Sequence, residues 1–393
     1  MIERWLKRLA RKVGLDRRSP LLSEAEFLAF RKAVLFPDDR DPVERFTKAF
    51  TRYLGVRHGV AVNSGTSALE VAVAAAGVGP GDEVIVPSYS YYSTASAVMK
   101  AGADAVFADV RLDDGGIDPD AIRRMSTEKT KAVIAVHLAG VPVDLDAILD
   151  LCRARGMTLI EDVAQAVGSE WRGRKLGSFG ALGCFSFQAS KQLGAGEGGF
   201  IATDDERLFS LCSAYSNVGL LPNVSDEEHT LLGGNYRLPR LEAALLSILL
   251  EKIDESMDRR AENATFLTAS LSGIPGITPA RRPSHATRIN LHFYGLRYDK
   301  PRFGGMPKSE VLSFLRNEGL PAEGGYPSPL YSHPAFGERT ELLSSGHPNT
   351  LELCATTIGF PQDFLTGSRR DMEHAVHTIR KLAERYADGV GAR

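Results

Sequence analysis

Apolar, strand-like runs alternate with helical stretches from about residue 40 to residue 250, and this alternation constrains the fold more than any other feature of the chain. The runs predicted as strands are 58–62, 83–87, 105–108, 132–136, 158–160, 184–187 and 199–203. The stretches predicted as helices between them are 66–76, 93–101, 119–125 and 144–155. Strands that alternate with helices form a mostly parallel sheet covered on both faces, and such a sheet binds its ligand beside the carboxyl ends of its strands. The sequence therefore predicts an α/β fold and the edge at which its site should lie.

The pattern changes beyond a long predicted helix over 241–260. The elements expected after it are a strand over 286–298, a helix over 308–317, a Pro-, Gly- and Tyr-rich loop over 321–334 and a terminal helix over 371–385. A chain of 393 residues is too long for one small core, so we expect two domains that share a cleft. The predicted organisation is an N-terminal arm over 1–40, a large domain over 41–250 and a smaller α+β domain over 251–393.

Composition argues against several classes of protein. The formal net charge is −2, which gives no electrostatic reason to bind nucleic acid. The four cysteines are too far apart in the sequence for a C-x-x-C pair, so a reducing cytoplasm is the simplest compartment. No apolar run has the length of a membrane-spanning helix, and no secretory signal is seen. The nine histidines show neither H-E-x-x-H nor a paired zinc spacing, so no metal site is expected.

The first 13 residues carry an amphipathic pattern with the period of a helix. The apolar positions are Ile2, Trp5, Leu6, Leu9, Ala10 and Val13, and the basic positions are Arg4, Lys7, Arg8, Arg11 and Lys12. We interpret this segment as an arm that packs on the body of the protein or on a partner subunit. The alternative is a basic helix that makes weak contact with an anionic membrane surface.

Two strand ends carry residues suited to an anion and to a flat ring. Asn63–Leu69 lies between a strand and the start of a helix, where free N–H groups and the helix dipole favour an anion. Ordinary helix capping by Ser or Thr would also account for this segment taken alone. An aromatic side chain in Pro87–Tyr92, after the next strand, could lie flat on a planar ring, although loop packing would explain it equally well.

Two further strand ends carry a carboxylate and a lysine. Glu161 and Asp162 end an apolar strand, and a partly buried carboxylate stays ionised only beside a cation or several hydrogen bonds. A protonated pyridine nitrogen would be such a cation, and capping of the next helix is the alternative. Lys191 follows the strand at 184–187, where burial can lower the pKa of a lysine so that its amine attacks a carbonyl. The glycines of 194–199 would let the backbone pass close to a bound cofactor.

Gly194, Gly196 and Gly199 also match G-x-G-x-x-G, the motif of dinucleotide-binding folds. That function requires a helix to open on the motif, whereas here the sequence predicts a strand over 199–203. We therefore do not expect a nicotinamide cofactor, and the chain has no P-loop sequence either.

Together, an anion cradle, an aromatic platform, a carboxylate for a ring nitrogen and a lysine, all at strand ends, describe a site for pyridoxal 5'-phosphate (PLP). At these residues the sequence resembles the DegT/DnrJ/StrS family of PLP-dependent sugar and cyclitol aminotransferases. The resemblance runs from about Phe46 to the C-terminus, and the block Phe185–Gly199 is its most specific part. The other matching positions are His137, Gly140, Pro142, Asp144 and Asn235-Tyr236-Arg237.

The resemblance implies a fold and a set of residue roles. The fold would be PLP-dependent transferase fold type I, as in aspartate aminotransferase, with a mostly parallel seven-stranded sheet between helices in its large domain. Lys191 and Asp162 would be catalytic, Lys191 as the Schiff-base lysine and Asp162 as the partner of the pyridine nitrogen. The other residues that would bind the cofactor are Tyr91 on the ring, Gln165 near the phenolic oxygen, and Gly65, Thr66, Ser186 and Asn235 around the phosphate. Asn235 would reach the phosphate of the neighbouring subunit, which implies a homodimer with shared active sites.

The implied reaction moves an amino group from glutamate or glutamine to a keto-sugar nucleotide or a keto-cyclitol, in the biosynthesis of amino sugars, aminocyclitols or polysaccharides. The family often has Asn where Gln192 stands and Asp where Ala181 stands, so the match leaves the acceptor open. Two alternatives are a PLP-dependent sugar dehydratase of the same family and a non-catalytic PLP-binding regulatory protein. Lys191 argues against the dehydratase, because some dehydratases of the family carry histidine there. The side chains that could line the acceptor site are Arg237, Tyr326, Tyr331 and His333.

Overall fold

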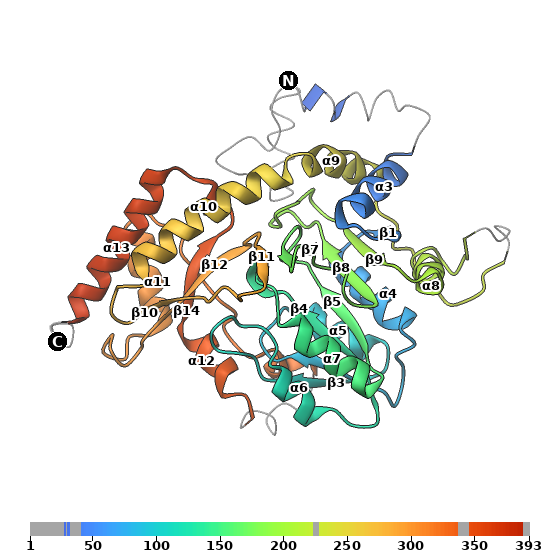
Figure 1. The fold of residues 1–393 in the computed structure, drawn as a ribbon, viewed down its shortest axis with the longest axis horizontal. Coiled ribbons are helices and arrows are strands. Elements are labelled where there is room, and N and C mark those ends of the chain that lie inside the picture. The colour runs from blue at the N-terminus through green and yellow to red at the C-terminus, as the bar shows by residue number, and fades with distance from the viewer. Residues whose placement is uncertain (1–26, 29, 32–40, 223–227, 337–345, 388–393) are drawn as a thin grey trace.

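A seven-stranded sheet forms the centre of the computed structural model, which describes residues 27, 28, 30, 31, 41–222, 228–336 and 346–387 (Figure 1). The strands, in their order across the sheet, are β1 (His58–Val62), β9 (Gly199–Thr203), β8 (Leu182–Ser186), β5 (Thr158–Asp162), β4 (Thr130–Val136), β2 (Glu83–Pro87) and β3 (Asp104–Ala108). Neighbours from β8 to β3 pair in parallel, whereas β9 is antiparallel to both β1 and β8. Because β1 and β8 both oppose β9, β1 runs in the common direction, and six carboxyl ends meet at one edge. The predicted mostly parallel sheet of seven strands is confirmed.

Helices cover both faces of this sheet. Those on one face are α3 (Pro42–Leu54), α6 (Pro119–Met125), α7 (Leu145–Arg155) and α9 (Arg240–Leu250), and those on the other are α4 (Gly65–Ala75), α5 (Ser93–Lys100) and α8 (Glu206–Ser216). Strand β2 shows how the sequence specifies two layers. Ile85 packs in the core that contains Phe46 and Phe50 of α3, whereas Val84 and Val86 pack in the opposite core. Successive side chains of a strand point to opposite faces, so an unbroken apolar run is needed in a sheet covered on both sides.

Capping residues determine where the helices begin beside the strand ends. The side chains of Ser64, Asp118 and Asp144 each accept a hydrogen bond from the backbone N–H three residues later, at 3.0, 3.2 and 3.2 Å. They begin α4, α6 and α7 respectively. A cap of this kind stabilises a helix start by roughly 0.5–2 kcal/mol. The start of α4 is thereby fixed directly after β1, at the edge where the sequence predicts the site.

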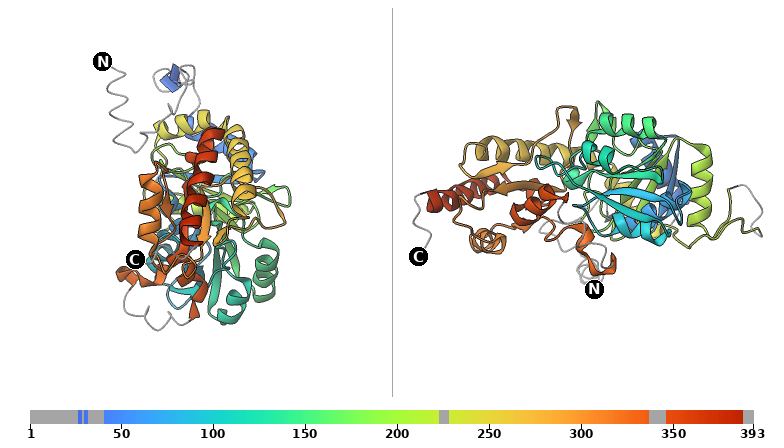
Figure 2. Two further views of the ribbon diagram at one scale, coloured as in Figure 1. Left: turned by 90° about the vertical axis from the view of Figure 1, so that its left-hand side faces the viewer. Right: turned by 90° about the horizontal axis from the view of Figure 1, so that it is seen from below.

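A second, antiparallel sheet lies beside the first (Figures 1 and 2). Its strands, in order, are β10 (Ile277–Pro279), β12 (Phe293–Tyr298), β14 (Thr357–Pro361) and β13 (Glu323–Gly324). It packs with α10 (Ile253–Leu271), α11 (Lys308–Asn317) and α13 (Arg369–Ala387) around a core that includes Leu296, Phe360 and Met372. We call these elements the small-sheet unit, and the seven-stranded sheet with α3 to α9 the large-sheet unit. Helix α12 (Pro348–Thr356) joins the two, because the buried Asp109 carboxylate, just after β3, accepts from the Thr350 N–H at 3.0 Å and its hydroxyl at 2.8 Å.

Two predicted elements of the second half were wrong. The single helix over 241–260 is two helices, α9 and α10, because Lys252 has φ −110° and ψ 1°, which is not helical. The single strand over 286–298 is two strands in different sheets. The first, β11 (Ala286–Arg288), pairs with β6 (Glu170–Trp171), which pairs with β7 (Arg174–Lys175). Between β11 and β12 the Asn290 N–H donates to the Ser169 hydroxyl at 2.8 Å, which draws the chain away from the ladder.

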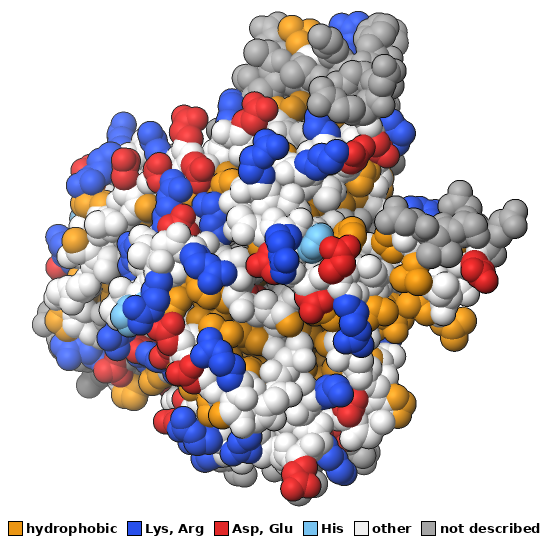
Figure 3. Space-filling model, turned by 45° about the vertical axis from the view of Figure 1, so that its right-hand side comes forward, with side chains coloured by type: hydrophobic (Ala, Val, Ile, Leu, Met, Phe, Trp, Pro, Cys, Tyr) orange, Lys and Arg blue, Asp and Glu red, His pale blue; other side chains and the backbone are white. Residues whose placement is uncertain are grey.

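The predicted loop over 321–334 contains β13 and two short 3₁₀ helices, Leu330–Ser332 and Pro334–Phe336. The amphipathic pattern at the N-terminus lies outside the described residues. Charged side chains of both signs are interspersed over the face in Figure 3, in keeping with the small net charge. None of the helices within the described ranges has the length and apolar character that crossing a membrane requires.

Candidate active site

The predicted site residues gather at the carboxyl edge of the large sheet. Asp162 is the last residue of β5, and Ser186 is the last residue of β8. Gly65 and Thr66 begin α4 directly after β1, and Lys191 lies in the loop between β8 and β9. The rule that a parallel sheet binds ligands at its carboxyl ends therefore places these groups together, as the sequence predicted.

Asp162 is buried and Lys191 is half-buried, and the two side chains lie close enough for their charges to interact. Asp162 is 5% exposed, and its carboxylate accepts hydrogen bonds from the Ala164 N–H at 3.1 Å and the Thr94 hydroxyl at 3.2 Å. Burial raises the pKa of Asp162 above its ordinary value, although the Ala164 N–H, the Lys191 charge and the Thr94 hydroxyl act against this rise. Burial lowers the pKa of Lys191, and the Asp162 charge opposes that change only in part. Burial thus acts against the charged form of both groups, and a further cation beside Asp162 would favour its ionised form.

The neighbouring carboxylate, Glu161, makes hydrogen bonds that stabilise the fold. It is fully buried, and its carboxylate lies 3.1 Å from His137 Nε2. The same carboxylate accepts three backbone N–H groups, from Gly177 at 2.9 Å, Phe179 at 2.7 Å and Gly180 at 2.8 Å. Burial raises the pKa of Glu161, but His137 and the N–H donors outweigh burial and leave the pKa below its usual value. Successive residues of a strand point to opposite faces of the sheet. The Glu161 side chain therefore binds the loop at 177–180 on one face, and the Asp162 side chain lies on the other face.

The start of α4 and the end of β8 approach each other too closely for side chains. A Cβ on Gly65 would lie 2.6 Å from the Ser186 Cβ, and a Cβ on Gly199 would lie 2.2 Å from the Ser64 backbone oxygen. The first N–H groups of α4 have no partners within their own helix. Two glycines thus bring these N–H groups beside the Ser186 hydroxyl, which gives a small polar cradle suited to a phosphate.

The loop that carries Lys191 is held by two glutamine side chains. The Gln192 amide donates to the backbone oxygens of Gln165 at 2.6 Å and Asn290 at 2.8 Å. The Gln362 amide, just after β14, donates to the Ser190 oxygen at 3.3 Å and the Lys191 oxygen at 3.4 Å. Both units of the fold therefore position the lysine.

Gln165 lies between Ala139 and Tyr326. Its side-chain oxygen accepts from the Ala139 N–H at 2.8 Å, and its amide nitrogen donates to the Tyr326 hydroxyl at 3.0 Å. Tyr326 comes from the small-sheet unit, and burial raises its pKa, with a further increase from the charge of Asp162. An amide has two N–H groups, so Gln165 keeps one that can donate to a bound ligand.

Two predicted residues have exposed side chains. Tyr91 is 60% exposed, so its ring is open to a ligand. Asn235 is exposed on a segment that bridges to Asn217, and no described contact joins it to Lys191 or Asp162. Sequence reasoning missed Thr94 as a partner of Asp162, because a threonine on a helix carries no signal of its own.

Comparison with known proteins agrees with this geometry. The model of the DegT/DnrJ/EryC1/StrS aminotransferase family matches residues 38–379. A putative L-glutamine:3-amino-2,3-dideoxy-scyllo-inosose aminotransferase of Streptoalloteichus tenebrarius is 37% identical over 295 residues, which cover 74% of this chain and 71% of that protein. The dTDP-3-amino-3,4,6-trideoxy-alpha-D-glucose transaminase of Streptomyces venezuelae is 35% identical over 296 residues, 75% of each chain. The crystal structure of 3-amino-5-hydroxybenzoic acid synthase superposes with a TM-score of 0.87 at 28% identity, over 94% of this chain and 98% of that one. The chain belongs to the DegT/DnrJ/EryC1/StrS aminotransferase family.

Proposed function

We propose that this protein holds PLP on Lys191 and transfers an amino group from glutamate or glutamine to a keto-sugar nucleotide or a keto-cyclitol. The observation that carries this proposal is the electrostatic interaction of Lys191 with the buried Asp162 at the ends of neighbouring strands. Relatives named for a cyclitol and for a nucleotide-linked sugar support the two classes of acceptor.

The residues present fit PLP at three points. The cradle of Gly65, Thr66 and Ser186 offers N–H and hydroxyl donors to the phosphate. Tyr91 is exposed and could lie on the face of the ring. Asp162, whose burial raises its pKa, needs a cation beside it, and a protonated ring nitrogen would supply that charge and hold the carboxylate ionised.

Lys191 would perform the proton transfers. When bound, PLP supplies an electron sink that makes a carbon next to the amino group acidic. Because burial lowers the pKa of Lys191, its Nζ releases its proton more readily than a free lysine does, and the neutral amine would take a proton from the α-carbon of the donor. The same Nζ would carry that proton until it is passed on, and the hydrogen bonds of Gln192 and Gln362 hold the loop that carries Lys191 in place. Gln165 would donate its remaining N–H to the phenolic oxygen.

Further parts of the proposal concern assembly. We propose a homodimer in which Asn235 of one subunit completes the phosphate site of the other, because Asn235 is exposed and separate from the cluster in its own chain. We propose that the two units act as domains on either side of the site, divided near residue 250 where α9 ends. The four cysteines are free and buried, which supports a reducing compartment such as the cytoplasm.

The test is the visible absorption spectrum of the purified protein before and after addition of glutamate or glutamine. We expect a band from bound PLP that one donor bleaches in the wild type and that is absent from Lys191→Ala. Lys308→Ala is the matched control, because burial lowers the pKa of Lys308 too, yet it bonds the Cys354 oxygen away from the cluster. A protein that takes up no PLP would refute the proposal. A stable band that neither donor changes would favour the dehydratase or the regulatory alternative.

A further inference from the structure

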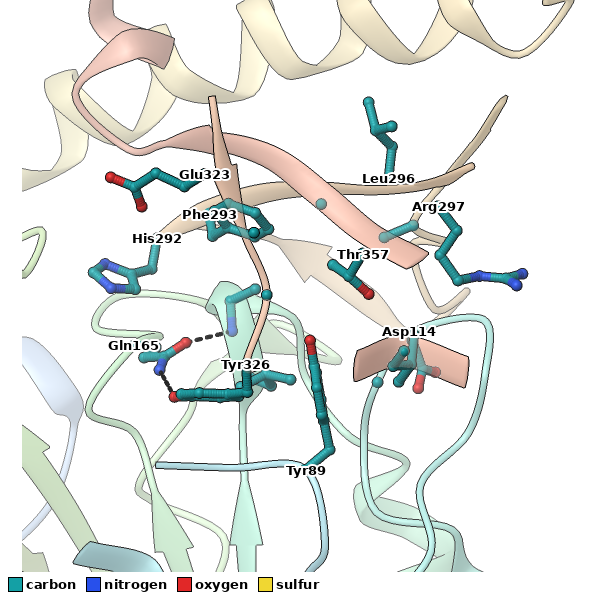
Figure 4. A pocket seen from close by; sticks show the side chains of 18 of the residues that line it. Tyr89, Asp114, Gln165, His292, Phe293, Leu296, Arg297, Glu323, Tyr326 and Thr357 are labelled. Atoms are coloured by element: carbon teal, nitrogen blue, oxygen red, sulfur yellow. Dashed lines mark hydrogen bonds between the residues drawn. The ribbon is translucent and has the colours of Figure 1, made fainter. Parts of the chain in front are cut away.

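A cavity of about 360 Å³ lies between the two units (Figure 4). The large-sheet unit contributes the segments after β2 and β3 and the turn at 138–139, and the small-sheet unit contributes β12, β14 and residues 323–327. Gln165 and Tyr326 form part of its wall, whereas Asp162 and Lys191 do not. Its size is that of a site for a small molecule. Apart from Gln165 and Tyr326, the residues that line this cavity have no role in the proposed reaction.

The cavity is mostly apolar but contains two buried hydroxyl groups. Leu112, Leu138 and Leu353 are among the apolar residues of its wall. Tyr89 is 4% exposed, and its hydroxyl and that of Thr357 have no hydrogen-bond partner among the described residues. The Thr357 side chain and the Tyr326 backbone are close enough to the Tyr89 phenol to oppose the rise in its pKa that burial causes, although neither hydroxyl has a partner at full hydrogen-bond geometry. Buried hydroxyl groups without partners destabilise a fold, so their presence on a cavity wall points to a ligand that binds them.

The position of Tyr89 depends on a glycine. A Cβ on Gly325 would lie 2.0 Å from the Tyr89 hydroxyl oxygen, so any other residue there would displace the phenol. The Tyr89 ring packs edge to face on Tyr326 with 5.3 Å between centroids. The Tyr89 hydroxyl thus extends past Tyr326 to the side of the cavity where Thr357 lies (Figure 4).

One cation on the wall is available to a ligand. Arg297, on β12, is half-buried and forms no ion pair or side-chain hydrogen bond within the described part of the chain. The neighbouring acids are already paired, Asp113 with Arg111 and Arg281 at 3.3 and 3.2 Å and Asp114 with Arg111 at 3.3 Å. Glu323 is exposed and lies on the opposite side of the cavity, next to His292 (Figure 4). A ligand group that binds on the side of Arg297 should therefore be an anion.

We infer that this cavity is a second binding site, for a small carboxylic acid with an apolar, ring-sized body and a hydroxyl group. The carboxylate pairs with Arg297, the body packs on the leucines, and the hydroxyl bonds to Tyr89 and Thr357. Because Tyr326 and Gln165 belong to both the wall and the site at the strand ends, a ligand here contacts residues that border Asp162. The inference does not depend on PLP chemistry at Lys191.

The test is titration calorimetry of the purified, full-length protein with three probes. The probe 3-hydroxybenzoate carries both groups, benzoate lacks the hydroxyl, and 3-hydroxybenzyl alcohol lacks the carboxylate. We expect 3-hydroxybenzoate to bind at least tenfold more tightly than either of the others. Tyr89→Phe should reduce its affinity to that of benzoate, and Arg297→Gln should reduce it to that of the alcohol.

Three controls keep the outcome decisive. Tyr331→Phe removes another buried hydroxyl without a described partner, but outside this cavity, and Arg302→Gln removes an exposed guanidinium; both should bind 3-hydroxybenzoate as the wild type does. Tyr89→Phe should melt at or above the wild-type temperature, which separates lost binding from lost folding. The inference is wrong if 3-hydroxybenzoate shows no saturable binding at millimolar concentration, or if Tyr89→Phe and Arg297→Gln bind it unchanged. It is also wrong if Lys191→Ala abolishes binding, since the probe would then occupy the site at the strand ends.

Discussion

The Gln192 side chain donates a hydrogen bond of 2.6 Å to the backbone oxygen of Gln165, so the residue after Lys191 holds the segment after Asp162. The same amide donates to the backbone oxygen of the buried Asn290 at 2.8 Å. Asn290 in turn donates to the Val167 oxygen at 2.8 Å. One side chain thus connects the lysine loop with the segment between β11 and β12.

Gln192→Asn should destabilise the protein although asparagine has the same functional group. Its side chain is one methylene shorter, so it cannot reach both carbonyl oxygens, and one buried acceptor is left without a donor. We expect a loss of about 1–3 kcal/mol in the free energy of unfolding, measured by urea denaturation without cofactor. Gln192→Glu, which keeps the length but has no N–H, should lose at least as much. Equal stability of both variants and the wild type would contradict this account.

The pH dependence of stability should reflect Asp114. Burial, together with the charge of Asp113, raises the pKa of Asp114 from 3.8 to about 6. A carboxyl group with a raised pKa binds its proton more tightly in the folded state, so stability falls as pH rises from about 4 to about 6 and stays low above. Asp114→Asn should remove this fall and raise the free energy of unfolding at pH 8 by about 1–3 kcal/mol.

Asp113→Asn is the matched control for that experiment. The pKa of Asp113 is lowered, because its bonds to Arg111 and Arg281 outweigh the effect of burial. Its charge therefore stabilises the fold at neutral pH, and Asp113→Asn should reduce stability at pH 8. Urea denaturation at several pH values would reveal the two opposite signs, and the same sign for both variants would refute the assignment.

Glu161→Gln should damage folding more than its chemical similarity suggests. Glu161 accepts hydrogen bonds from three backbone N–H groups and faces His137. In glutamine one of the two oxygens is replaced by an NH₂ group, which cannot accept a hydrogen bond from these N–H donors. We expect a loss of about 2–4 kcal/mol in the free energy of unfolding. Glu44→Gln, on the exposed surface of α3, should change it by less than about 0.5 kcal/mol. A stable Glu161→Gln protein without activity would instead indicate a catalytic Glu161.

Gly199→Ala should weaken the phosphate cradle. The new Cβ would lie 2.2 Å from the Ser64 backbone oxygen, and only movement of β9 or of the α4 start can relieve this contact. We expect a loss of about 1–3 kcal/mol in stability together with weaker PLP uptake, followed by fluorescence titration. Gly79→Ala is the control, because its Cβ would meet no atom within 4 Å. Unchanged PLP affinity in Gly199→Ala would show that the cradle tolerates the extra methyl group.

Subunit mixing tests the proposed shared site. Lys191→Ala and Asn235→Ala homodimers should each be inactive or weak, whereas a heterodimer has one site with both residues intact. Random reassociation after mild denaturation should then restore about one quarter of wild-type activity. No recovery, with heterodimers confirmed by mass spectrometry, would mean that Asn235 acts within its own subunit.

Much of the site could be predicted because its parts lie next to strand ends in the sequence. The positions of Asp162, Ser186 and Lys191 follow from local patterns, an apolar run and then a polar or small residue. The Gln165–Tyr326 contact could not be predicted, because it joins residues of two units far apart in the chain. The same is true of Thr94, which reaches Asp162 from helix α5.

The errors in the fold have a similar cause. The sequence predicts one strand over 286–298 from its apolar residues. The buried hydrogen bond from the Asn290 N–H to the Ser169 hydroxyl interrupts that strand. The interruption of the helix at Lys252 could not be predicted, because no proline or glycine lies next to it in the sequence. Local periodicity finds elements, whereas tertiary hydrogen bonds decide where they are interrupted.

The position of β9 has a consequence for how the protein is made. In the described sheet β1 pairs with β9 alone, so Val62 has no strand partner in the sheet until Gly199 has been made. When β1, β2, β3, β4, β5 and β8 have left the ribosome, β1 is therefore still an unpaired strand. Long-range pairing of this kind slows folding and prolongs the time in which an unpaired edge can aggregate. The phosphate cradle should thus be among the last parts of the large sheet to form, and a ligand bound there would stabilise the completed sheet.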